Sequence, residues 1–367
     1  MKVPFADFGP QYHEIKNEVD QGLKAIFEQG NFILGQPVKD FEAAFATHCQ
    51  AKHGIGVNSG TDAIHLAMRA LGVGPGDEVI VPTFTFVATA LGVSYTGTKP
   101  VFVDIEEDTH NMDPQAVEKA ITKKTKAIMP VHLYGQPANM EAINKIAKKK
   151  DIAVVEDACQ AHGAMYQNRR IGSLGTMACF SFYPTKSLGA CGDGGMVVTS
   201  DDALAEKVRM FRDYGRTGRY EHKFIGYNSR LDTVQAVILL AKLKHLDRWN
   251  KMRADVSAHY HAMLKDVKGV ILPSTRNDRT HVFQTFAVSI KKDRDKVCER
   301  MQKKEISVLI HYPIPIHLQE AYRDTGCKKG DFPVSEAFAG EELSLPMFPH
   351  MTKEQVESVV SALKESL

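Results

Sequence analysis

The chain has 367 residues, of which 43% are hydrophobic and 25% are charged, and its formal net charge is +2. This composition is that of an ordinary soluble globular protein, and the nearly balanced charge argues against a nucleic-acid partner. The sequence shows neither a secretory signal core nor an apolar run of the ~20 residues that span a membrane, so we expect a cytoplasmic protein without a membrane partner. The six cysteines are scattered without Cys-x-x-Cys pairs, and no metal site is expected.

Short apolar segments rich in β-branched residues alternate with helical patterns between residues 54 and 200. Seven segments are strand-like, and they begin at Gly54, Glu78, Pro100, Lys126, Ile152, Cys179 and Gly195. The helical patterns between them place apolar residues at spacings of three and four, and they begin at Thr61, Asp113 and Asn139. This alternation predicts an α/β fold with one large, mostly parallel sheet of seven strands and crossover helices.

The pattern changes after Asp202 and becomes rich in helices up to residue 265. A second, shorter alternation follows, with strand-like segments at 281–290 and 306–312 and helical patterns at 293–304 and 352–367. These segments predict a small C-terminal α+β domain. Since a domain averages roughly 150 residues, we expect two domains, a large one at 1–250 and a small one at 251–367.

The segment Ser59–Thr61 lies where the first predicted strand gives way to a helix. Free backbone N–H groups at a helix N-terminus attract an anion, so a phosphate group fits this position. The alternative is that a Ser or Thr side chain here only caps the helix. The tripeptide alone leaves both interpretations open.

Two residues further along the chain have the chemistry to bind an aldehyde cofactor. Asp157 ends the strand-like segment from Ile152, and a carboxylate at the carboxyl end of a parallel strand can keep a pyridine nitrogen protonated. Lys186 stands between the aromatic segment 180–183 and a cluster of glycines, and a lysine amine in such a place can form an imine. Ser181 can offer a hydroxyl to phosphate. The alternatives are a helix-capping aspartate and a solvated surface lysine.

The spacing around Lys186 rejects two other phosphate-binding motifs. A Walker A loop has glycine directly before its Lys-Ser pair, whereas Thr185 stands there in this chain. A dinucleotide fingerprint places G-x-G-x-x-G between a strand and a helix, whereas the glycines from Gly192 lead into another strand. NAD binding is therefore disfavoured.

Six motifs in chain order resemble those of the DegT family of nucleotide-sugar aminotransferases, over nearly the whole chain. They are GTDA from Gly60, PTFTFVATA from Pro82, EDACQAHGA from Glu156, FSFYPTKSLGA from Phe180, GDGGMVVT from Gly192 and GYNSRLDTVQA from Gly226. The resemblance implies fold type I of the PLP-dependent transferases, with pyridoxal phosphate (PLP) as cofactor and a homodimer that shares its active sites. It also implies glutamate and a nucleotide sugar as substrates, in deoxyamino-sugar biosynthesis such as that of lipopolysaccharide O-antigen.

The resemblance further implies a role for each matching residue. Lys186 would carry the cofactor as a Schiff base and act in proton transfer, while Asp157 would pair with the pyridine nitrogen. Gln160 would contact the side of the ring that bears the phenolic oxygen, and Phe86 would stack on the ring face. The residues implied to bind the phosphate are Ser59, Gly60, Thr61, Ser181 and, from the partner subunit, Asn228. Core packing for Phe86 and a turn role for Asn228 are the alternatives.

Three details favour amination at C3 of the sugar, because members with these features resemble sugar 3-aminotransferases. They are Tyr183, the sequence GDGG at 192–195, and Tyr214. The expected acceptor is a dTDP-linked 3-keto-6-deoxyhexose or a UDP-linked 3-keto-N-acetyl sugar. Candidate substrate contacts are Tyr183, Arg216, His311, Tyr312 and His317. A sugar 4-aminotransferase and an inactive regulatory homologue are the alternatives.

Overall fold

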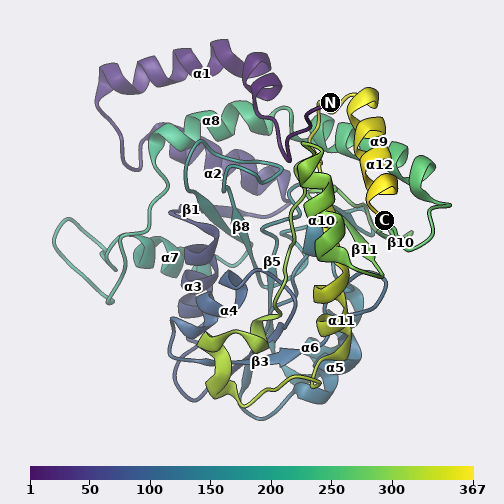
Figure 1. Ribbon diagram of the computed structural model, residues 1–367. Coiled ribbons are helices and arrows are strands. Elements are labelled where there is room, and N and C mark those ends of the chain that lie inside the picture. Colours follow the sequence, from purple (N-terminus) through teal and green to yellow (C-terminus); the bar gives the residue numbers. More distant parts are fainter.

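The computed structural model describes residues 1–367 and contains a central sheet of seven strands in the order β1-β9-β8-β5-β4-β2-β3 (Figure 1). The strands are β1 (His53–Val57), β2 (Glu78–Pro82), β3 (Lys99–Val103), β4 (Thr125–Ile128), β5 (Ala153–Asp157), β8 (Met177–Ser181) and β9 (Gly195–Thr199). All seven strands were predicted. Strand β9 alone runs in the opposite direction to the other six strands of this sheet, so the prediction of a mostly parallel sheet is confirmed.

Helices cover both faces of this sheet. They are α2 (Gln36–His48), α3 (Gly60–Ala70), α4 (Ala88–Ser94), α5 (Pro114–Ala120), α6 (Met140–Lys150), α7 (Asp202–Arg212) and α8 (Thr233–Leu243). Successive residues of a strand point to opposite faces, so Val154 packs in the cluster that includes α2, α6 and α8, while Val155 packs in the cluster that includes α3, α4 and α7. The sheet is thereby buried on both sides, as parallel sheets are.

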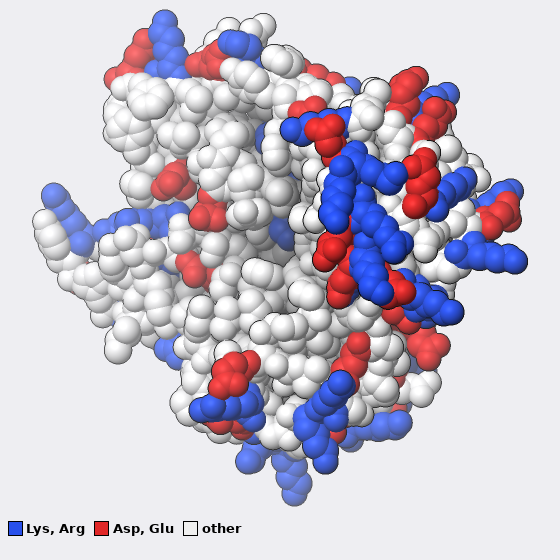
Figure 2. All heavy atoms as spheres, in the orientation of Figure 1, with Lys and Arg blue, Asp and Glu red and all other residues white.

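A second sheet holds three antiparallel strands, β10 (Val270–Ile271), β11 (Phe286–Ile290) and β12 (Glu342–Leu345). Its helices are α9 (Leu246–Leu264), α10 (Arg294–Lys303), α11 (Pro333–Glu341) and α12 (Lys353–Ser366). Lys and Arg side chains gather over α10, with acidic atoms beside them (Figure 2). Smaller elements are α1 (Gly9–Gln29), the hairpin β6 (Met165–Tyr166) and β7 (Arg169–Arg170), and short 3-10 helices at Leu133–Gly135, Ile316–Leu318 and Glu320–Thr325.

The predicted strand at 306–312 is wrong. This segment pairs only through isolated bridges, from Ile306 to Val3 and from Leu309 to Ser344. It runs between the N-terminal segment and β12 and matches each at one position, so no continuous ladder forms. Strand β12 was not predicted, because it spans only four residues and ends directly before Pro346.

Helix α9 joins the two sheets. Its residue Leu246 packs in the core of the large sheet, whereas Tyr260 packs in a separate cluster with the second sheet and α12. The proposed division of the chain between residues 250 and 251 falls inside this helix and stays a prediction. No helix combines the length and the apolar character that crossing a bilayer needs.

Candidate active site

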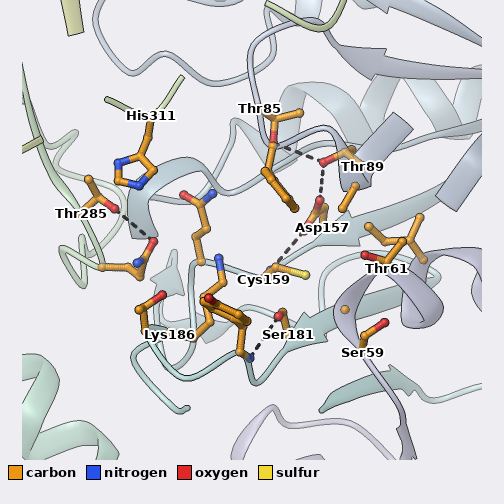
Figure 3. Close-up of a pocket in the computed structure, with 18 of the residues that line it drawn as sticks. Ser59, Thr61, Thr85, Thr89, Asp157, Cys159, Ser181, Lys186, Thr285 and His311 are labelled. Atoms are coloured by element: carbon orange, nitrogen blue, oxygen red, sulfur yellow. Dashed lines mark hydrogen bonds between the residues drawn. The ribbon is translucent and has the colours of Figure 1, made fainter. Parts of the chain in front are cut away.

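A cavity of about 420 Å³ lies at the carboxyl ends of β5 and β8, where α/β sheets place their ligands. Part of its wall comes from the C-terminal region of the chain, so the cavity lies between the two sheets (Figure 3). Eleven predicted site residues line it, namely Ser59, Gly60, Thr61, Phe86, Asp157, Gln160, Ser181, Tyr183, Lys186, His311 and Tyr312.

The first residues of α3 form the part of the cavity suited to an anion. Ser59 is the N-cap, and its hydroxyl accepts a hydrogen bond from the Asp62 N–H at 3.1 Å. The N–H groups of Gly60 and Thr61 have no acceptor within the helix, because the first turn of a helix leaves its donors free. An ideal Cβ built on Gly60 would lie 2.5 Å from the Ser181 Cβ, so only glycine allows β8 and α3 to approach this closely. Capping and anion binding are thus compatible at this helix end.

Asp157 is the last residue of β5, and the residue is 4% exposed. One carboxylate oxygen accepts a hydrogen bond from the Thr89 hydroxyl at 2.7 Å, and the other accepts from the Cys159 N–H at 3.2 Å. Figure 3 shows both bonds. Two donors thus hold the carboxylate in one orientation, and each oxygen keeps lone pairs for a further partner.

Lys186 supplies an amine to the same cavity. Its Nζ makes no hydrogen bond or ion pair with the protein, although the backbone N–H is fixed by the Tyr183 carbonyl at 2.9 Å. Burial lowers the pKa of Lys186, while the nearby Cys159 and Asp157 act in the opposite direction. A buried amine with a lowered pKa is neutral for a larger fraction of the time, and the neutral amine is the nucleophile that forms an imine.

Aromatic rings and an amide border the space between Asp157 and Lys186. Phe86 is 52% exposed as a residue, which does not fit the alternative of core packing, and its ring lies 5.7 Å from the Tyr312 ring, centroid to centroid. Gln160 accepts a hydrogen bond from the Tyr134 N–H at 2.6 Å and donates to the Tyr312 hydroxyl at 3.4 Å. The amide is therefore oriented from two sides.

Apart from Cys159, seven polar residues of the lining were not predicted as site residues, and they are Thr85, Thr89, Tyr134, Thr185, Asp193, Gln284 and Thr285. Thr185 and Asp193 lie within two of the six motifs. Thr85 and Thr89 flank Phe86 in a motif that was already recognised, so they could have been found. Tyr134, Gln284 and Thr285 lie outside the six motifs, and only the folded chain brings them to the cavity.

Three predicted residues lie outside the cavity. His317 is buried, with Nδ1 2.6 Å from the Thr83 hydroxyl and Nε2 3.1 Å from the Glu336 carboxylate, so its predicted substrate contact lacks geometric support. Arg216 forms an ion pair within the segment between α7 and α8, which projects from the body of the molecule (Figure 1). Asn228 is exposed in the same segment, and its predicted contact across a subunit interface stays a prediction.

The residues present fit pyridoxal phosphate. The free N–H groups of α3 and the Ser181 hydroxyl suit its phosphate, and the Asp157 carboxylate suits its pyridine nitrogen. The unpaired Lys186 amine suits its aldehyde. Glycine at position 60 lets the N-terminus of α3 lie directly against Ser181, which brings the free N–H groups and the Ser181 hydroxyl together.

The DegT/DnrJ/EryC1/StrS aminotransferase family model matches residues 13–364. The chain belongs to this family. A relative from Geobacillus stearothermophilus named "Pleiotropic regulatory protein" is 48% identical and covers 100% of this chain and 98% of its own. The dTDP-3-amino-3,4,6-trideoxy-alpha-D-glucose transaminase of Streptomyces venezuelae is 46% identical over 99% of this chain and 96% of its own. The crystal structure of S. venezuelae DesV in complex with a ketimine intermediate superposes with a TM-score of 0.96 and 46% identity, covering 99% of this chain and 98% of that chain.

This DegT/DnrJ/EryC1/StrS family member is therefore an aminotransferase whose cofactor is pyridoxal phosphate. Its architecture is fold type I of the PLP-dependent transferases, as the motifs indicated. The close relatives with assigned reactions are sugar aminotransferases.

Proposed function

We propose that this aminotransferase moves the amino group of glutamate to C3 of a 3-keto nucleotide sugar, with a dTDP-linked 3-keto-6-deoxyhexose as the first candidate. The observation that carries the chemistry is the single cavity that holds the Lys186 amine, the Asp157 carboxylate and the N-terminus of α3. The relative named for a dTDP-3-amino sugar supports the choice of C3 and of the dTDP group. A UDP-linked 3-keto-N-acetyl sugar is the other candidate acceptor.

The bound cofactor supplies a ring that withdraws electrons from the substrate carbon next to nitrogen, which makes that carbon easier to deprotonate. In this proposal the N-terminus of α3 and Ser181 bind the phosphate, and Phe86 and Gln160 fix the position of the ring. The Asp157 carboxylate keeps a proton on the pyridine nitrogen, because a nearby negative charge stabilises the cationic form. The hydrogen bonds from Thr89 and Cys159 orient that carboxylate before the reaction begins.

Lys186 carries the proton in both halves of the reaction. In the first half, once Lys186 is free of the cofactor, its Nζ would take the proton from the α-carbon of glutamate and pass it to the cofactor side. In the second half the transfer would run in the reverse direction, and Nζ would deliver a proton to C3 of the sugar. This role needs the neutral amine, and burial favours that form by lowering the pKa of Lys186. A lysine in the same place with an ion-pair partner would stay protonated and would serve poorly as a base.

We also propose that the working unit is a homodimer, in which Asn228 of the partner subunit completes the phosphate site. Asn228 is bridged to Asp213 at the base of the segment between α7 and α8, and its exposure there suits a contact outside its own chain. Mixed dimers of Lys186→Ala and Asn228→Ala subunits test this arrangement, because one of their two sites regains both residues. Recovery of activity on mixing is expected, and no recovery in a verified mixed dimer would contradict the shared site.

Substrate contacts are proposed for Tyr183, His311 and Tyr312, which line the cavity, and for Arg216 across the subunit interface. The test is incubation with glutamate and either a 3-keto or a 4-keto nucleotide sugar, each as its dTDP and UDP form. A 3-amino product identified by NMR supports the proposal. A 4-amino product would contradict C3 specificity, and no transfer to any sugar would favour a regulatory role.

A further inference from the structure

A chain of polar groups runs from the cavity into the second sheet, behind His311. The Nδ1 atom of His311 lies 2.8 Å from the Ser344 hydroxyl oxygen, and the Ser344 hydroxyl donates to the Glu342 carboxylate. Glu342 and Ser344 both belong to β12 and are 0% exposed. The other ring nitrogen of His311, Nε2, makes no hydrogen bond with the protein, and His311 lines the cavity (Figure 3).

The Glu342 carboxylate has a second fixed donor. Its Oε2 accepts a hydrogen bond from the His311 backbone N–H at 2.6 Å. The Arg294 guanidinium of α10 donates to the Glu342 backbone carbonyl and is the nearby positive charge. Tyr134, Tyr312 and Cys298 face the same carboxylate as neutral groups whose pKa values are raised. A buried glutamate this well connected is not explained by packing alone.

When Glu342 is ionised, the hydrogen bonds between Glu342, Ser344 and His311 determine which ring nitrogen of His311 carries the hydrogen. An ionised carboxylate only accepts, so the Ser344 hydroxyl gives its single hydrogen to Glu342. The Ser344 oxygen can then only accept from His311, which requires the hydrogen on Nδ1. Burial and the Lys186 charge lower the pKa of His311 to about 4, so the ring is neutral. Nε2 therefore presents a lone pair to the cavity.

When Glu342 is protonated, the hydrogen of the His311 ring lies on the other nitrogen. Oε2 must still accept from the His311 N–H, so the added proton sits on Oε1 and is donated to Ser344. Ser344 then donates to Nδ1, and the hydrogen of the neutral ring moves to Nε2. Burial raises the pKa of Glu342 to about 7, which brings this change into the neutral range.

We propose that Glu342, acting through Ser344, is a positioning residue that sets His311 as a hydrogen-bond acceptor for a hydroxyl group of the sugar substrate. This inference rests on the proposed function for the identity of the substrate. It also predicts weaker binding of a sugar that lacks this hydroxyl, since such a sugar cannot donate a hydrogen bond to Nε2. A buried carboxylate orienting a histidine tautomer is a general device in enzyme sites.

The direct test is ¹⁵N NMR of the histidine-labelled holoenzyme at pH 8.5, with the His311 signals assigned by their absence in His311→Gln. We expect a lone-pair nitrogen at Nε2 and a protonated nitrogen at Nδ1. In Glu342→Gln the amide oxygen must face the His311 N–H and the amide nitrogen must donate to Ser344, so the two signals should exchange. Glu341→Gln is the matched control, because Glu341 is the preceding residue and pairs only with Lys291.

The steady-state test compares the same variants with the accepted nucleotide sugar. In Glu342→Gln the sugar hydroxyl would have to accept from Nε2 and direct its own hydrogen elsewhere, so KM for the sugar should rise by up to about tenfold, while Glu341→Gln leaves it unchanged. A protonated Nε2 in the unmodified enzyme at pH 8.5, or identical NMR signals in Glu342→Gln, would overturn the proposal. The NMR result needs no substrate, so it stands even where the proposed function fails.

Discussion

At Asp157, two donors on different elements hold a carboxylate at the edge of the large sheet. Thr89 belongs to α4, and the Cys159 N–H follows β5 directly. Fixed orientation matters because an electrostatic group assists a reaction most when it needs no rearrangement. Two uncharged donors, the Thr89 hydroxyl and the Cys159 N–H, therefore orient the charged carboxylate of Asp157.

Replacing Asp157 with Asn removes the charge and keeps the shape. We expect transamination to fall by about 10² to 10³-fold, because the pyridine nitrogen would lose the group that keeps it protonated. Asp201→Asn is the matched control, since Asp201 only caps α7 and Asn caps equally well. Steady-state rates at saturating cofactor measure the effect. Equal activity of the two variants would contradict the role of Asp157.

The residues at strand ends could be predicted from the sequence for a physical reason. Asp157 and Ser59 follow apolar runs whose β-branched composition marks buried strands, and parallel strands bring their carboxyl ends to one edge. Thr285 and His311 could not be placed in this way. They come from the second sheet region, and the packing of that region against the large sheet is not encoded in any local pattern.

At the scale of elements, the contact between α3 and β8 shapes the anion site. The helix begins at Gly60, whose backbone lies against Ser181 at the end of β8. The seven strands of this sheet were predictable because the apolar pattern of each segment and the turn residues that bound it both indicate a strand. The segment 306–312 has strand-like periodicity as well, but its neighbours offer only single bridges, and tertiary pairing overrode the local pattern.

Gly60→Ala tests this close contact. The added Cβ would lie 2.5 Å from the Ser181 Cβ, so we expect a loss of about 1–3 kcal/mol in the free energy of unfolding, together with weaker cofactor binding. Gly74→Ala is the control, because nothing lies within 4 Å of its Cβ. Urea denaturation and cofactor titration measure both effects. Unchanged cofactor affinity in Gly60→Ala would show that the anion binds elsewhere.

At the scale of the whole molecule, buried histidines link stability to pH. His162 is 0% exposed beside Phe180, and neither ring nitrogen has a hydrogen-bond partner. Burial, and secondarily the Lys186 charge, lower the pKa of His162 to about 3. The unfolded chain therefore takes up a proton near pH 6.5 that the folded chain rejects, and stability falls as the pH drops from 6.5 towards 3.

His162→Leu should flatten this dependence. Between pH 6.5 and pH 5 the variant should lose less unfolding free energy than the unmodified protein, by up to ~1.4 kcal/mol per pH unit. His13→Leu, a change at an exposed histidine, should keep the original slope. Urea titrations at a series of pH values give the slopes. Parallel curves for His162→Leu and the unmodified protein would exclude His162 as the cause.

The central claim is that Lys186 holds the cofactor, and borohydride reduction of the PLP-loaded protein tests it most directly. Reduction makes the lysine–cofactor bond permanent, and peptide mass spectrometry then locates it. We expect the cofactor mass on the peptide that contains Lys186, a yellow absorption before reduction that glutamate bleaches, and neither in Lys186→Ala. A colourless protein with excess cofactor, or a label on another lysine, would contradict the account.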